Sequence, residues 1–81
     1  MRIITKDKHG NEFPLDIDSN SKVEDIMKKI SELKGGIPLE RIMILNGSRR
    51  MDEMKKVADY NLQDGSELLV IFRRDPELNN T

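Results

Sequence analysis

The sequence contains no cysteine and no tryptophan, and no apolar run approaches the roughly 20 residues that a membrane-spanning helix needs. Without cysteine, disulfides and thiolate metal sites are excluded. With 14 basic and 15 acidic residues, neither sign of charge dominates, which argues against binding nucleic acid or a membrane by bulk electrostatic attraction. The start, Met1-Arg2-Ile3-Ile4, has no long apolar segment behind it and does not resemble a signal peptide. We therefore expect a cytoplasmic or nuclear location.

The sequence also offers few combinations of residues that could carry catalysis or bind a metal. His9 is the only histidine, falls in a predicted loop and has no second histidine or cysteine at ligand spacing. The acidic residues are scattered, and no glycine-rich phosphate loop is present. Because no nucleophile–base pair or metal cluster can be assembled, we predict that the protein is not an enzyme and uses no cofactor.

Two strands joined by a turn are predicted at the start of the chain. Residues 1–6 are rich in β-branched side chains, and residues 13–17 alternate between apolar and polar positions, as a strand with one buried face does. Gly10 suits the positive φ angle of the turn between them. Pro14 has no backbone N–H group, so the second strand should lie at a sheet edge.

A single amphipathic helix should follow. Ser21 and Glu24 have the spacing of a capping box, which would start the helix. The Gly35-Gly36 pair ends it, and Pro38 prevents its continuation. Apolar residues recur between them at helical spacing, at Val23, Ile26, Met27, Ile30 and Leu33.

Two more strands, at residues 41–45 and 66–73, complete the predicted domain. The order β-β-α-β-β predicts an α+β fold, a β-grasp in which a mixed sheet packs against one helix and the first and last strands lie in parallel. We expect one domain over residues 1–74 and a polar tail or linker over residues 75–81. The predicted core is Met1, Ile3, Phe13, Leu15, Ile17, Val23, Ile26, Ile30, Met43, Leu45, Leu62, Leu68 and Val70.

Several short segments, taken in order and at nearly unchanged spacing, resemble the ubiquitin-like family, which includes ubiquitin and the neddylation modifier. The segments are Met1-Arg2-Ile3, Val23-Glu24-Asp25-Ile26, Gly36-Ile37-Pro38, Asn46-Gly47, Asp59-Tyr60-Asn61-Leu62-Gln63 and Ser66-Glu67-Leu68. None is specific alone, but the collinear set, over about residues 1–74, implies the ubiquitin-like β-grasp fold. The resemblance also implies that the Tyr60 hydroxyl ties down a neighbouring loop.

One departure from the family bears on function. Modifiers of this family end in a flexible Gly-Gly whose carboxylate is joined to lysine, whereas here Arg73-Arg74 is followed by Asp75-Pro76-Glu77, and no Gly-Gly occurs after Gly65. Asp75 and Pro76 add bulk, charge and a fixed φ angle. Conjugation is therefore not expected.

The last two predicted strands carry more apolar residues than one buried face can use. If Met43 and Leu45 point inward beside Leu68 and Val70, alternation turns the other apolar residues outward, at Ile42, Ile44, Leu69 and Ile71. A contiguous exposed apolar patch on a small domain usually marks an interface. The resemblance implies that the positions matching Ile44 and Ile71 dock helical ubiquitin-binding elements.

Positive charge is predicted around this patch, from Lys6, Lys8, Arg49, Arg73 and Arg74. It would favour a partner with acidic residues beside an apolar anchor, although a solvated basic edge explains the same pattern. The predicted partner-binding residues are Lys8, Ile42, Ile44, Gly47, Leu69, Ile71 and Arg73.

We therefore predict a non-conjugated ubiquitin-like domain of the ubiquitin–proteasome system that binds other proteins. It would dock its host on ubiquitin-interacting helices, proteasome receptors or ubiquitin ligases. Two alternatives remain: a structural or self-associating scaffold domain, and a modifier, which the missing Gly-Gly disfavours.

Overall fold

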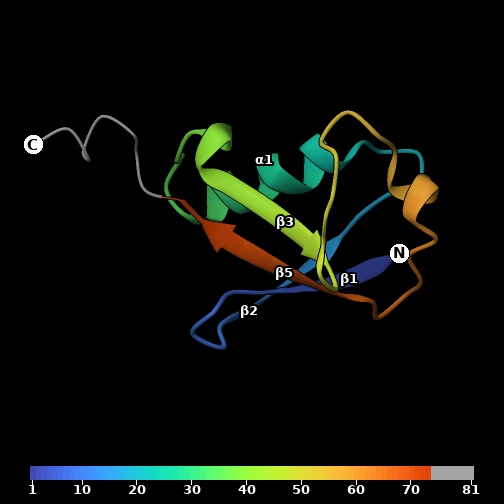
Figure 1. Ribbon diagram of the computed structural model, residues 1–81, viewed down its shortest axis with the longest axis horizontal. Coiled ribbons are helices and arrows are strands. Elements are labelled where there is room, and N and C mark those ends of the chain that lie inside the picture. Colours follow the sequence, from blue (N-terminus) through green and yellow to red (C-terminus); the bar gives the residue numbers. More distant parts are fainter. Residues whose placement is uncertain (74–81) are drawn as a thin grey trace, which may run out of the picture.

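The computed structural model describes residues 1–73 as a mixed five-stranded sheet with one α-helix (Figure 1). The strands are β1 (Arg2–Lys6), β2 (Glu12–Asp16), β3 (Ile42–Asn46), β4 (Arg49–Arg50) and β5 (Glu67–Phe72), in the spatial order β2-β1-β5-β3-β4. β1 and β5 pair in parallel, and the other neighbours pair antiparallel. The predicted α+β fold is confirmed, with β4 as an additional short strand. The predicted tail lies outside the described residues.

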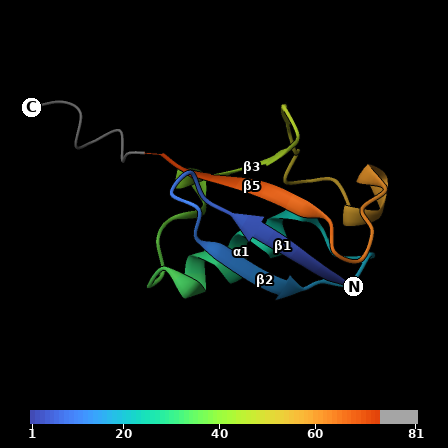
Figure 2. The same cartoon turned by 90° about the horizontal axis from the view of Figure 1, so that it is seen from below.

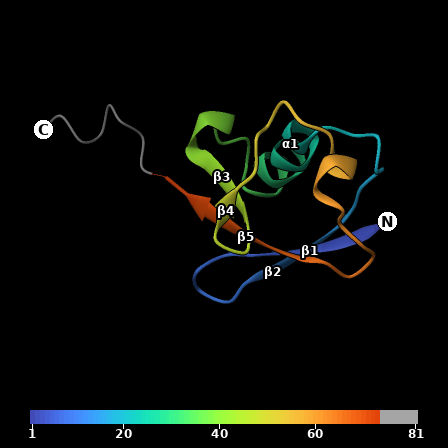
Figure 3. The same cartoon turned by 45° about the vertical axis from the view of Figure 1, so that its right-hand side comes forward.

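All helical segments lie on one side of the sheet. The helix α1 (Val23–Leu33) crosses it, with the short 3₁₀ helices η1 (Leu39–Arg41) and η2 (Val57–Tyr60) on the same side (Figure 3). Figure 2, seen from below, shows β1, β2 and β5 in front and α1 behind them. Among residues 1–73, no helix covers the opposite, outer face of the sheet.

Pro14 lies in the edge strand β2, as predicted. The Ile17 N–H donates to the Met1 carbonyl oxygen at 2.8 Å. The backbone N–H and C=O groups of the odd-numbered residues from 13 to 17 therefore point toward β1. Alternation then turns the backbone of Pro14 toward the free edge, where its missing N–H costs no ladder hydrogen bond.

The helix begins one residue later than the capping-box prediction. Lys22 is the N-cap residue, and its backbone N–H donates to an Asp25 carboxylate oxygen at 3.0 Å. The prediction of a Ser21–Glu24 box is therefore wrong; Ser21 instead donates its N–H to the Asp18 carbonyl at 2.9 Å and closes the preceding turn. A carboxylate at the first turn also complements the helix dipole.

Two consecutive glycines end the helix. Gly35 and Gly36 have φ angles of +82° and +89°, and the Gly36 N–H donates to the Ser31 carbonyl at 2.7 Å. The Ser31 hydroxyl donates to the Ile37 carbonyl at 2.6 Å. These bonds satisfy helix-terminal groups and turn the chain toward β3.

The core lies between α1 and the inner face of the sheet. The predicted residues Ile3, Leu15, Ile17, Val23, Ile26, Ile30, Leu68 and Val70 are buried, whereas Met1, Phe13 and Leu62 lie partly buried at its margin. Met43 and Leu45 are only half-buried, so their assignment to the core is wrong. Buried residues that the core prediction omitted are Thr5, Asp7, Met27, Ile42, Ile44, Met51 and Val57.

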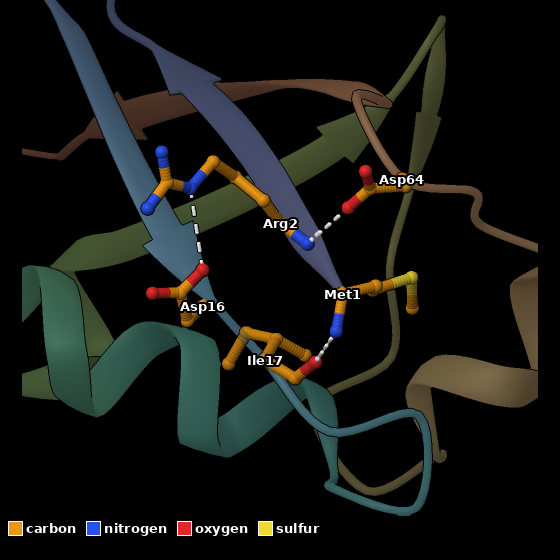
Figure 4. A network of polar contacts seen from close by, with 5 residues as sticks. All are labelled: Met1, Arg2, Asp16, Ile17 and Asp64. Carbon is orange, nitrogen blue, oxygen red and sulfur yellow. Dashed lines mark hydrogen bonds and ion pairs between the residues drawn. The ribbon is translucent and has the colours of Figure 1, made fainter.

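The first residues are held by polar contacts (Figure 4). The Met1 ammonium donates to the Ile17 carbonyl at 2.8 Å, and the Arg2 backbone N–H donates to an Asp64 carboxylate oxygen at 2.6 Å. The Arg2 side chain pairs with Asp16 at 3.2 Å and lowers the pKa of that carboxyl. This ion pair is exposed, so its contribution to stability is small.

Tyr60 fixes the long segment between β4 and η2. Its hydroxyl accepts a hydrogen bond from the Asp52 backbone N–H at 2.7 Å, which confirms the predicted role. Asn61 follows in the left-handed conformation, with φ at +52°, which asparagine tolerates better than most residues.

Candidate functional site

Four apolar side chains lie together on the outer face of β3 and β5. Strand pairing places Met43 opposite Ile71 and Leu45 opposite Leu69, and directly opposed residues point to the same face. All four side chains are half-buried, since neighbouring side chains cover part of each. We call Met43, Leu45, Leu69 and Ile71 the outer-face patch.

The prediction that Ile42 and Ile44 are exposed is wrong. Each is 2% exposed and packs into the core, Ile44 directly opposite Val70 and Ile42 opposite Phe72. Leu69 and Ile71 face outward as predicted, because the inward assignment of Leu68 and Val70 is confirmed, and their contact with a partner stays a prediction. In β3, therefore, the outward-facing pair is Met43 and Leu45.

The error has a physical cause. Alternation shows which residues of a strand share a face, but in β3 both alternating sets are apolar, so alternation alone cannot choose the buried one. Arg41 precedes β3 in the same alternating set as Met43 and Leu45. A charged residue in that set is the signal that could have identified it as the outer one.

Cationic residues surround much of the outer-face patch. Arg41 and Arg73 lie at one end, where the Arg73 N–H donates to the Arg41 carbonyl at 2.6 Å and the Arg41 Nε donates to the Arg73 carbonyl at 3.0 Å. Arg50 lies opposite Leu45, and Lys6 lies opposite Leu69. Of these, Arg41 and Arg50 were missed by the sequence prediction.

A shallow hollow of about 250 Å³ lies at the other end of the patch, lined by Lys6, Gly47, Glu67, Leu68 and Leu69. The structure thus brings the predicted residues Gly47 and Leu69 together. Lys6 pairs with Glu67 at 2.5 Å, and this carboxylate raises the pKa of Lys6, which stays cationic. Lys8 is exposed and is not among the lining residues.

The loop that carries Lys8 is fixed by a buried carboxylate. Asp7 accepts the backbone N–H groups of His9 and Asn11 on one oxygen, and the Asn11 side-chain amide on the other, each at 2.9 Å. These hydrogen bonds lower the pKa of Asp7, and the one from the Asn11 side chain contributes most. The loop thus has a defined conformation that presents Lys8 to solvent.

Asp7 should make stability depend on pH in the acid range. Because its pKa is lower in the folded than in the unfolded chain, its ionised form stabilises the fold above the unfolded pKa of about 3.9. This contribution is lost as the pH falls through the folded pKa. We expect Asp7→Asn to be less stable than the wild type at neutral pH, with the difference shrinking in acid.

Urea unfolding of both proteins at a series of pH values measures this difference. The Arg2–Asp16 pair is present in both, so its own titration cancels in the comparison. A stability difference that stays constant from neutral pH to about pH 2 would contradict the role of Asp7.

Neither a metal-binding cluster nor a membrane-spanning helix occurs in the part of the chain that the structure describes. Residues 1–73 contain no group of three or more histidine, cysteine, aspartate or glutamate side chains that could hold a metal ion. None of the helices there is both long and apolar enough to cross a membrane.

Comparison with known proteins agrees with the fold. The sequence model of the ubiquitin family matches residues 2–75. The chain is 31% identical over 72 residues to "Ubiquitin-like protein NEDD8" of Dictyostelium discoideum, covering 89% of this chain and 92% of that protein. It is 35% identical over 72 residues to "Ubiquitin-like protein 1" of Schizosaccharomyces pombe, covering 89% and 91%. The chain therefore belongs to the ubiquitin family.

Proposed function

We propose that this domain is a non-conjugated, protein-binding member of the ubiquitin family. The observation that carries the proposal is the outer-face patch, in which four apolar side chains lie on a sheet face that no helix of residues 1–73 covers. Apolar groups gathered on the surface of a small domain favour association with another protein. In the known sequence, Asp75-Pro76-Glu77 follows Arg73-Arg74 in place of Gly-Gly, which supports binding over conjugation.

The charges around the patch favour a particular kind of partner. Arg41, Arg50 and Arg73 have no carboxylate partner among the ion pairs of residues 1–73, whereas Lys6 is paired with Glu67. A partner helix with an apolar stripe and flanking acidic residues would complement this arrangement. Ubiquitin-interacting helices, proteasome receptors and ubiquitin ligases are the proposed partners, in the cytoplasm, the nucleus or both.

Titration of the isotope-labelled domain with a ubiquitin-interacting helix, followed by NMR, tests the proposal. We expect micromolar affinity, with shifts at Leu45, Leu69 and Ile71. Ile71→Asp should weaken binding about 10- to 100-fold, since a carboxylate replaces an apolar contact.

A matched control is Met54→Asp, which introduces the same carboxylate at an apolar residue that is 62% exposed and lies outside the patch. It should leave the affinity unchanged. Equal weakening by both variants, or no shifts at the patch, would refute the proposal. A molecular mass that rises with concentration in light scattering, and that Ile71→Asp lowers to the monomer value, would favour the self-associating scaffold.

A further inference from the structure

A pocket of about 290 Å³ lies at the edge of β3, between α1 and the segment that follows β4. In Figure 3 this segment, drawn in yellow, runs from β4 up to the level of α1. The lining residues are Met27, Ile42, Met43, Ile44, Arg50, Met51, Asp52 and Glu53. The pocket shares Met43 with the outer-face patch and Arg50 with the cationic residues around it, and its other residues form a separate surface around the strand edge.

The segment that follows β4 forms one wall of the pocket, and hydrogen bonds to its backbone hold it in place. The Asp52 N–H donates to the Tyr60 hydroxyl at 2.7 Å, and the Glu53 carbonyl accepts the Glu24 N–H at 3.0 Å. Just beyond, the Val23 N–H donates to the Lys55 carbonyl at 2.9 Å. A wall fixed in this way loses little conformational entropy when a ligand binds.

The floor of the pocket suits an aromatic side chain. Met27 and Met51 are buried lining residues, and their thioethers adapt in shape and make favourable contacts with aromatic rings. The volume is at the lower end of the roughly 300–1,000 Å³ of small-molecule pockets, so it matches one inserted side chain better than a cofactor.

The mouth of the pocket carries two carboxylates and one guanidinium. Asp52, Glu53 and Arg50 are all exposed, and none of them takes part in an ion pair within residues 1–73. The Asp52 carboxylate accepts the local Met54 N–H at 2.9 Å. The balance of charge at the mouth is therefore negative and complements a cation beside the inserted ring.

We propose that this pocket is a second docking site, which receives one aromatic side chain flanked by a basic residue from a peptide segment of a partner protein. The ring lies on the methionine floor, and the basic side chain contacts Asp52 and Glu53. Apart from Met43, the lining residues of the pocket lie outside the outer-face patch, so one domain can contact two different segments.

The five methionines provide the reporters for a test. The domain is labelled with ¹³C at the methionine methyl groups and titrated with the synthetic peptide acetyl-Gly-Phe-Arg-Gly-amide. We expect saturable shifts at Met27 and Met51 with a dissociation constant on the order of 1 mM, while Met54 stays unchanged as an exposed reporter on the same segment. The peptides with Ala in place of Phe, or Glu in place of Arg, should bind at least about threefold more weakly.

Two variants separate this site from its neighbour. Glu53→Gln should lower the affinity for the Phe–Arg peptide about two- to fivefold, the range of an exposed ion pair. Ile71→Asp should leave the peptide-induced shifts at Met27 and Met51 unchanged. Absence of shifts at Met27 and Met51 up to about 10 mM peptide would overturn the proposal. So would equal affinity for the Arg and Glu peptides.

Discussion

Replacing Ile44 by alanine is expected to lower the free energy of unfolding by about 2–5 kcal/mol. Ile44 is 2% exposed and faces Val70 across the strand pair, so the truncation leaves a cavity in the core between the sheet and α1. For an 81-residue protein this is a large share of the total stability, which is expected to be modest at this size. Chemical denaturation measures it directly.

The adjacent residue gives the matched control. Leu45 has a side chain of the same size but points to the outer face and is half-buried, so Leu45→Ala should cost only about 1 kcal/mol. Leu45→Ala should instead weaken binding to the partner of the outer-face patch. A larger loss of stability from Leu45→Ala than from Ile44→Ala would mean that β3 presents the opposite face to the core.

Replacing both Gly35 and Gly36 by alanine is the second change with a large expected effect, a loss of about 2–4 kcal/mol. Both residues have positive φ angles, and a Cβ built at either one meets no atom within 4 Å. The cost is therefore conformational, about 1–2 kcal/mol for each position, and not a packing clash.

Asparagine at the same two positions separates these causes. It is larger than alanine but tolerates the left-handed region better, so the Asn pair should destabilise the protein less than the Ala pair. Thermal or urea unfolding of the two double variants provides the comparison. A greater loss with Asn would point to crowding at the end of α1 and contradict the conformational explanation.

Much of the fold was predictable because local patterns and long-range pairing agree. Alternation identified β2, helical spacing identified α1, and Gly35-Gly36 marked where the helix ends. Pro14 indicated the edge of the sheet because it lacks a backbone donor. The parallel pairing of β1 and β5 followed from the right-handed crossover rule.

The candidate site was only half predictable, and the difference lies in β3. In β5 the buried set, Leu68 and Val70, was assigned correctly, and so the outward direction of Leu69 and Ile71 was predicted too. In β3 every residue from Ile42 to Leu45 is apolar, and the buried set is determined by the cross-strand register with β5. That register depends on contacts between residues distant in sequence, and the local pattern hints at its outcome through the charged Arg41 in the outward set.

The pocket at the β3 edge was beyond the reach of sequence patterns for a related reason. Its floor joins Met27 of α1 to Met51, which follows β4, and its wall depends on the hydrogen bond from Asp52 to Tyr60. These residues meet only after the chain has folded. Helical spacing could indicate that Met27 is buried, but not which side chains lie beside it.

The parallel pairing of β1 and β5 also determines how the domain responds to mechanical tension. The Ile4 N–H donates to the Ser66 carbonyl at 2.8 Å, and the Gly65 N–H donates to the Arg2 carbonyl at 2.7 Å. When Met1 and Arg73 are pulled apart, β1 and β5 are drawn past each other in opposite directions, so the hydrogen bonds between them bear the load together. Their rupture is one concerted event, and the rate of forced unfolding, unlike the equilibrium stability, should depend mainly on this one strand pair.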